Sequence, residues 1–309
     1  MRGFFTLCHL PTSLLAVLVD SAAPWVSRVA EREKSRDSRP DPMRVVKAHA
    51  YGNDFLLVPA GGGPGDGGPL ARALCDRHTG IGADGLILYT LRDCGATMVL
   101  HNADGGVAEL SGNGLRCLAA LVARVQHLRA GVAVRVDTEA GVKALDLLDV
   151  QDSRYLFRAG LGPPANLRLA QIQVEGEIVA ATVMRLGNPQ CVVLGPLPDA
   201  ARFARLGPAL ATHPMFPSGT NVEFAQVDAP DRVRILIWER GVGPTSSSGT
   251  GAAAAAVAAA HGGAAREMDV IAPGGTQRVE WNADGVYLTG WAVIVLDGTW
   301  VGAVSTYSG

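Results

Sequence analysis

The sequence predicts an α+β protein made of two halves that are built alike. Predicted strands outnumber helices, and each half contains one long helix rich in Ala or Leu among short strands. The two long helices follow similar glycine-rich turns, Ser111-Gly112-Asn113-Gly114 and Ser248-Gly249-Thr250-Gly251. An internal repeat of this kind indicates two copies of one architecture.

The elements of the first half are predicted from apolar segments that turn residues separate. Strands are expected at residues 45–58 (with a turn at Gly52-Asn53), 86–89, 98–102, 132–137, 142–148 and 155–162. The strand at 98–102 leads into the first Ser-Gly turn. Helices are expected at residues 71–77 and 115–125.

The second half repeats this pattern from residue 166 on. Its strands are expected at residues 172–174, 178–186, 191–194, 233–239, 268–271, 279–281, 286–289 and 292–296. Its helix, residues 252–260, is almost entirely alanine and ends at His261-Gly262-Gly263, a C-terminal signal. Because alanine lets neighbours approach closely on every side, this helix suits a buried central position.

Composition narrows the classes of partner. The 309 residues carry a formal net charge of −2, which gives no electrostatic reason to expect nucleic acid. The 5 cysteines form no Cys-x-x-Cys pair, so no metal is expected, and Cys117 and Cys191 are expected to be buried core thiols. No apolar run reaches about 18 residues. We therefore expect a cytoplasmic protein without a membrane partner.

Residues 1–42 precede the predicted fold. An apolar region after Arg2 and a cleavage-like Ser21-Ala22-Ala23 are typical of a signal peptide, but His9 and Pro11 interrupt that region. We expect residues 1–42 to be a disordered extension or the product of a start codon assigned too early. A signal peptide is the alternative.

Ser111 and Ser248 are the first candidate site residues, because each lies where a long helix begins. Unpaired N–H groups and the helix dipole favour anion binding at such a position. Two facing helix starts would place a hydroxyl on each face of one substrate, which suits proton removal on one face and delivery on the other. The alternative is that both serines only cap their helices.

Six ordered motifs resemble the diaminopimelate epimerase family, from about Met43 to the end of the chain. They are Gly52-Asn53-Asp54-Phe55, residues 77–85, residues 101–105 with 111–114, Gly187-Asn188-Pro189, residues 217–221, and Glu239-Arg240-Gly241 with residues 248–251. Their shared order makes the resemblance specific. It implies two pseudo-symmetric domains, each a strand barrel around a central helix, with the active site between them. The expected domains are residues 43–162, to which residues 298–309 return, and residues 163–297.

The resemblance also implies that three catalytic positions differ here. The family carries its acid/base cysteines where this chain has Ser111 and Ser248, and usually a histidine where it has Gln190. A thiol has a free pKa near 8.5, which falls further at a helix start, whereas a serine usually needs an adjacent base. Gln190 cannot accept a proton. Glu239 remains as the helper on one side.

The substrate-binding positions of the family are retained. Backbone N–H groups of Gly112, Asn113, Gly249 and Thr250 are expected to hold the α-carboxylate and to stabilise negative charge as the α-proton leaves. Amide and guanidinium groups are expected to hold the rest of the substrate: Asn53, Asn102, Asn188, Asn221 and Arg240, with Glu239 beside them. The alternatives are turn stabilisation by each Asn and a surface ion pair for Arg240.

The expected function is the cofactor-independent, two-base conversion of LL-2,6-diaminopimelate to the meso form, in lysine and peptidoglycan biosynthesis. The partner is a small amino-acid substrate, and the resemblance allows a homodimer. Two alternatives stay open, both motivated by the serines and Gln190. One is a related racemase or isomerase of the same fold, and the other is a catalytically impaired, amino-acid-binding homologue.

Overall fold

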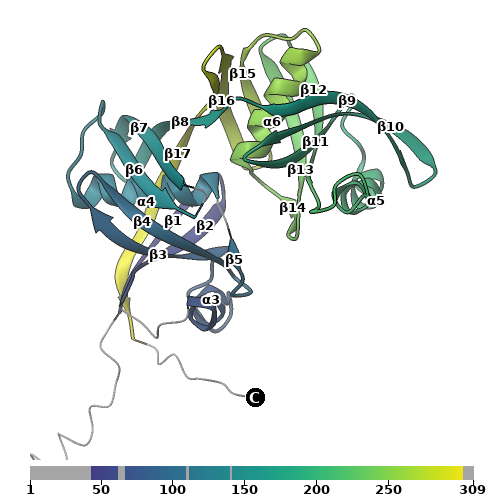
Figure 1. Cartoon of the computed structure of the whole chain (residues 1–309). Helices are drawn as coiled ribbons and strands as arrows, with labels where there is room; N and C mark the ends of the chain where they lie inside the picture. Colours follow the sequence, from purple (N-terminus) through teal and green to yellow (C-terminus); the bar gives the residue numbers. More distant parts are fainter. Residues whose placement is uncertain (1–42, 62–66, 109–110, 140, 302–309) are drawn as a thin grey trace, which may run out of the picture. The chain divides into compact units, whose positions relative to one another are not determined.

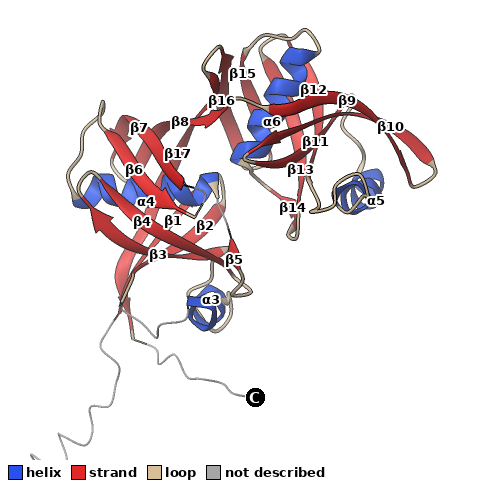
Figure 2. Cartoon of the chain, viewed as in Figure 1, coloured by secondary structure: helices blue, strands red, loops and turns tan. Residues whose placement is uncertain are grey.

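Strands make up most of the structure (Figure 2), which confirms the α+β prediction. This computed structural model describes residues 43–61, 67–108, 111–139 and 141–301. The expectations for residues 1–42 and 302–309 lie outside the described residues. So do Glu109 and Leu110, just before the first Ser-Gly turn, and Ala140 in the predicted hairpin turn.

The first half is a closed barrel of strands around a helix. Its elements are β1 (Met43–Ala50), β2 (Asn53–Pro59), α3 (Gly67–Cys75), β3 (Gly85–Arg92), β4 (Gly95–Asn102), β5 (Val107–Ala108), α4 (Gly112–Val125), β6 (Ala133–Thr138), β7 (Gly141–Gln151), β8 (Arg154–Gly162) and β17 (Gly285–Trp300). Pairing runs through β1, β2, β3, β4, β6, β7, β8 and β17 and returns to β1. Helix α4 packs against strands around this ring (Figure 1).

The second half arranges its strands around a second helix. Its elements are β9 (Ala165–Val174), β10 (Glu177–Leu186), β11 (Asn188–Leu194), α5 (Ala200–Ala211), β12 (Asn221–Ala229), β13 (Arg232–Glu239), β14 (Gly243–Thr245), α6 (Gly249–His261), β15 (Glu267–Ala272) and β16 (Gly275–Asn282). Pairing runs from β9 through β10, β11, β12, β13, β15 and β16 to β17. Helix α6 packs against β10 to β13 and β15 to β17.

The two halves share one topology. In the first half, β2 and β3 are parallel with α3 between them in the chain, and β4 and β6 are parallel with α4 between them. In the second half, β11 and β12 flank α5 in the same way, and β13 and β15 flank α6. Each long helix therefore crosses over between two parallel strands, which confirms the repeat that the sequence indicated.

The core of each half surrounds its long helix. On α4 a continuous run of side chains from Leu115 to Ala123 is buried against β1, β2, β4 and β17. On α6 every residue from Ala252 to Ala259 is buried, so the prediction of a central alanine helix is confirmed. Small side chains let strands approach this helix from all sides. Cys117 and Cys191 are buried, as predicted.

Several elements differ from the sequence-based expectation, among them one helix and two long strands. Helix α5 was not predicted, because Gly207 and Pro208 interrupt its helical pattern. Strand β12 was not predicted either. The strands expected at residues 286–289 and 292–296 are one strand, β17, which passes through Gly290 without a turn. A Cβ at Gly290 would lie 3.2 Å from the Tyr51 hydroxyl, so this glycine makes room for a ring rather than for a bend.

Candidate active site

Ser111 and Ser248 are the N-cap residues of α4 and α6. Both have extended backbone, and each hydroxyl oxygen accepts a hydrogen bond from a glycine N–H in its helix, Gly114 at 3.1 Å and Gly251 at 3.2 Å. The capping role that the sequence left open is therefore observed. It uses a lone pair of each oxygen and leaves the hydroxyl proton available for a ligand.

The two helix starts lie next to each other. A Cβ added to Gly112 would be 3.9 Å from the Cα of Gly249. The first N–H groups of a helix have no acceptor within it, so those of Gly112, Asn113, Gly249 and Thr250 are available to a ligand. Two positive helix ends at one place favour a carboxylate there.

A buried polar network, missed from sequence, connects the two Ser-Gly turns. The Asn113 amide donates to the carbonyl of Ser247 at 3.3 Å, and the Arg116 guanidinium donates to the side-chain oxygens of Asn113 and Gln277. Gln277 in turn donates to the Ser247 hydroxyl at 3.3 Å. Arg116 is fully buried with no acidic partner among the described residues, and burial lowers its pKa. Its one sequence signal is its position two residues after the glycine turn.

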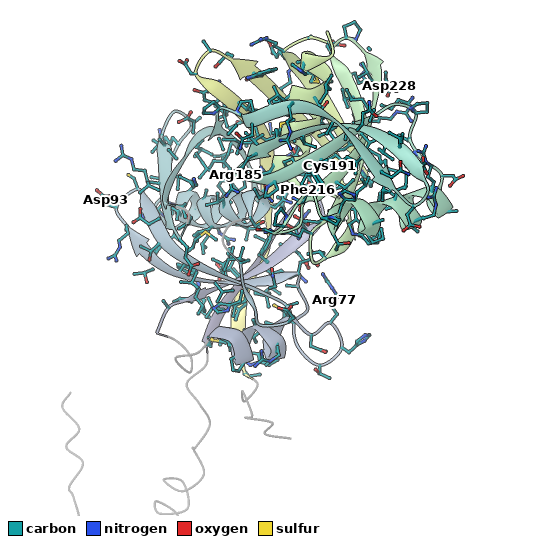
Figure 3. All side chains as sticks on the ribbon, turned by 45° about the vertical axis from the view of Figure 1, so that its right-hand side comes forward. Arg77, Asp93, Arg185, Cys191, Phe216 and Asp228 are labelled. Carbon is teal, nitrogen blue, oxygen red and sulfur yellow. The ribbon has the colours of Figure 1, made fainter. Side chains whose placement is uncertain are left out.

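Asn53 is held between this network and a charged cluster. Its side-chain oxygen accepts from Asn113 at 3.2 Å, and its amide donates to Asp84 at 2.8 Å. Arg77, labelled in Figure 3, donates to Asp54 and to Asp84, both at 2.8 Å. Burial opposes ionisation of Asp54, but hydrogen bonds from Arg77 and Lys47 outweigh it, so the Asp54 pKa is lowered. Asn53 is therefore fixed in orientation.

In the second half, the predicted amides lie on neighbouring strands. Gln190 and Asn221 are register partners on β11 and β12. Gln190 donates to the side chain of Asn188 at 2.6 Å, while its own oxygen is buried without a partner. Asn221 accepts from the backbone N–H of Arg240 at 3.0 Å, and its amide nitrogen is also buried and unpartnered. Two amide groups are thus free to bind a ligand.

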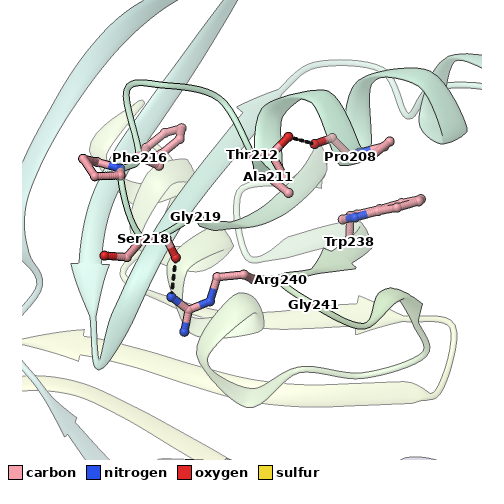
Figure 4. A pocket seen from close by; sticks show the side chains of 10 residues that line it. Pro208, Ala211, Thr212, Phe216, Ser218, Gly219, Trp238, Arg240 and Gly241 are labelled. Atoms are coloured by element: carbon pink, nitrogen blue, oxygen red, sulfur yellow. Dashed lines mark hydrogen bonds between the residues drawn. The ribbon is translucent and has the colours of Figure 1, made fainter.

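Arg240 lies at the edge of a surface hollow (Figure 4). Its guanidinium donates to the Ser218 carbonyl at 2.6 Å, and no ion pair of Arg240 occurs within the described ranges. The surface ion pair that the sequence allowed is therefore not formed there. The hollow, of about 380 Å³, is lined by residues of α5, the loop after it and β13. Neither Ser111 nor Ser248 borders it. Arg240 is the residue that this hollow shares with the predicted substrate-binding set.

Asn102 belongs to the first half of the fold. It ends β4, and its register partner on β3 is Gly85. Its side chain is exposed, and this side chain forms no hydrogen bond within the part of the chain that the structure describes. It is free to contact a substrate, but the structure does not bring it into the network of Asn113 and Arg116.

Two carboxyl groups lie on the strands that precede α6. Glu239 ends β13, and burial, followed by the charge of Asp84, raises its pKa. Glu223 on β12 was missed from sequence. It is fully buried, both of its oxygens lack a partner, and burial and the charge of Glu239 raise its pKa well above the ordinary range.

Similarity to known proteins agrees with this geometry. The sequence model of the diaminopimelate epimerase family matches residues 45–164 and 182–295. The chain belongs to this family. A diaminopimelate epimerase of Desulforudis audaxviator is 43% identical over 282 residues, which cover 84% of this chain and 100% of that protein. One from Desulfitobacterium hafniense is 37% identical, with 83% and 97% covered.

Solved structures share the fold of this family member at low sequence identity. A probable proline racemase of Agrobacterium radiobacter superposes with a TM-score of 0.64 at 17% identity, covering 86% of this chain and 94% of that one. A hydroxyproline epimerase of Agrobacterium vitis gives a TM-score of 0.63 at 18% identity, with 84% and 93% covered. The fold class is therefore two pseudo-symmetric strand barrels, each around a central helix.

The described residues contain neither a membrane-spanning helix nor a cluster of metal ligands. No helix there is both long enough and apolar enough to cross a membrane. No group of three or more His, Cys, Asp or Glu side chains there is arranged to hold a metal ion.

Proposed function

We propose that this protein is a diaminopimelate epimerase, which converts LL-2,6-diaminopimelate to the meso form by two-base proton exchange without a cofactor. The observation that carries the proposal is the pair of adjacent helix starts, each capped by a serine and each with free N–H groups. The relatives named for this activity match over nearly their whole length.

In this mechanism the N–H groups of Gly112, Asn113, Gly249 and Thr250 bind the α-carboxylate of the substrate. As the α-proton leaves, negative charge moves onto that carboxylate, where the helix ends stabilise it. Ser111 and Ser248 face the two sides of the α-carbon, and one removes a proton while the other delivers one. Glu239 assists one serine; Gln190 orients Asn188 and transfers no proton.

The remaining amides and Arg240 bind the distal ammonium and carboxylate of the substrate. The free nitrogen of Asn221 and the free oxygen of Gln190 support a polar site there. We further propose that the protein acts in the cytoplasm, where lysine and peptidoglycan precursors are made, and that it forms a homodimer. Its two domains in this proposal are residues 43–162 with 298–309, and residues 163–297.

The test is incubation of the purified protein with LL-diaminopimelate in deuterated water. We expect deuterium at the α-carbon and the appearance of the meso form. Absence of both at high enzyme concentration contradicts the proposal. A screen of other amino acids in the same assay tests the related racemase.

One observation favours a second candidate, a diaminopimelate-binding protein without turnover. Neither serine hydroxyl is hydrogen-bonded to a base among the described residues. This candidate predicts a ligand-dependent rise in melting temperature without deuterium exchange. A protein that shows neither effect at millimolar diaminopimelate contradicts both candidates.

A further inference from the structure

Glu223 is a buried carboxyl group that no structural interaction explains. It is fully buried in the middle of β12, and neither oxygen has a hydrogen-bond partner among the described residues. Burying such a group unpaired costs folding free energy. A carboxyl group buried at this cost in an otherwise apolar core around α6 calls for another role.

The position of Glu223 is beside the start of α6. Its neighbours on β12, Val222 and Phe224, pack in the cluster that contains α5, so Glu223 points to the other face, toward α6. A Cβ added to Gly251 would lie 2.6 Å from the Glu223 Oε1 atom and 3.2 Å from the Ser248 Oγ atom. The carboxyl and the hydroxyl therefore border the same small space, which a glycine leaves open.

We propose that Glu223 is the positioning residue that exchanges protons with Ser248. This inference rests on the proposed function. When Ser248 delivers a proton, the hydroxyl hydrogen moves to the substrate α-carbon, the Glu223 hydrogen moves to Oγ, and Glu223 is left as a carboxylate. In the reverse direction, Oγ takes the α-proton and its own hydrogen returns to Glu223. No alkoxide is formed in either direction.

The charges around Glu223 suit this exchange. Burial raises the pKa of Glu223, and the charge of Glu239 on β13 raises it further. The charge of Glu223 in turn raises the pKa of Cys191 on β11. No basic group contributes to its pKa, and α6 presents only small uncharged side chains and the Ser248 hydroxyl here. A carboxyl group with a raised pKa is a better proton donor and acceptor near neutral pH than an ordinary one. Hydrogen bonds of this kind often close only when substrate is bound.

The test is a double-mutant cycle of Glu223→Gln and Ser248→Cys, read by deuterium exchange into diaminopimelate. Glu223→Gln keeps the shape but cannot exchange a proton, so we expect a loss of about 100-fold or more in the parent. In the Ser248→Cys background we expect less than about 10-fold, because a thiol ionises without help. Gly251→Ala, whose methyl group enters the shared space, is expected to lower the rate as well.

A control variant and a pH profile separate the outcomes. Glu267→Gln, which changes an exposed carboxylate on β15, is the matched control and should retain the parent rate. The pH profile of kcat should lose its carboxyl-dependent limb in Glu223→Gln, which a purely structural role would not cause. Equal losses in both backgrounds overturn the inference, as does an unchanged rate. A parent that exchanges no α-proton overturns the proposed function, and this inference with it.

Discussion

At the scale of single residues, we expect oxygen instead of sulfur at positions 111 and 248 to limit catalysis. Both side chains sit at helix starts, which lower the pKa of a thiol into the working range but cannot do so for a hydroxyl. We predict that Ser111→Cys with Ser248→Cys raises the epimerisation rate by about 100-fold or more, with each single change gaining little. Deuterium exchange into LL-diaminopimelate measures this.

Adding Gln190→His to the double variant should increase the rate again. Gln190 is fully buried next to Asn188, so a histidine there would place a titrating ring beside the site. Binding of diaminopimelate, followed by thermal shift, serves as the control for all three variants. If the double variant binds but is no faster than the parent, the serines are not the acid/base pair.

Arg116 is another residue whose role is open to direct test. It is buried without an acidic partner, and a Cβ on Gly249 would lie 3.6 Å from its Nη1 atom. A cation so close to the start of α6 should favour a bound carboxylate. We predict that Arg116→Met raises KM for diaminopimelate about tenfold or more, and that Arg116→Lys, which keeps the charge, raises it less. Equal KM values for the two variants contradict the electrostatic role.

At the scale of elements, the alanine helix α6 sets how closely the strands of the second half approach. Ala255 is fully buried in the middle of it. We predict that Ala255→Leu destabilises the protein by about 1 to 3 kcal/mol, because the added methylenes displace packed strands. Ala201→Leu, on the exposed side of α5, is the matched control and should change stability by less than about 0.5 kcal/mol. Urea denaturation measures both.

The sequence was informative where a local pattern carries the structure. Glycine-rich turns with Ser at the N-cap, followed by alanine or leucine runs, predicted α4 and α6, and turn residues predicted the hairpins. Helix α5 was missed because Gly207 and Pro208 interrupt its helical pattern, and strand β12 because its signal depends on tertiary packing. Residues Asn221 to Ala225 are all buried, since α6 covers one face of β12 and α5 the other. A single Glu among alternating apolar residues is typical of a solvent-facing position, which is why Glu223 was overlooked.

At the scale of the whole molecule, the site depends on groups that sequence order keeps far apart. The hydrogen bonds from Asn113 to Ser247 and from Arg116 to Gln277 join segments more than 100 residues apart, at separations of 134 and 161. No local pattern predicts such partners. The motifs located the two helix starts, whereas the fold determines that they meet.

The pH dependence of folding stability gives a last prediction, on the molecule as a whole. The pKa of Glu223 is raised above its ordinary value of 4.5 in the folded protein. Above pH 4.5 the unfolded chain therefore loses this proton while the folded protein keeps it, so stability falls as pH rises toward the folded pKa. Glu239 acts in the same direction. Asp54, whose pKa is lowered, acts in the opposite direction but only below its ordinary value of 3.8.

Of the two glutamates with a raised pKa, Glu223 has the larger shift, and Glu223→Gln removes it. Relative to the parent, the variant should gain free energy of unfolding as pH rises above about 4.5, by about 1.4 kcal/mol for each unit of raised pKa. Part of the decline with pH should remain, because Glu239 is unchanged. Urea denaturation at several pH values measures the difference. Parallel stability curves for the two proteins would mean that Glu223 is ionised in the folded state, and that the fold supplies it with a partner for its charge.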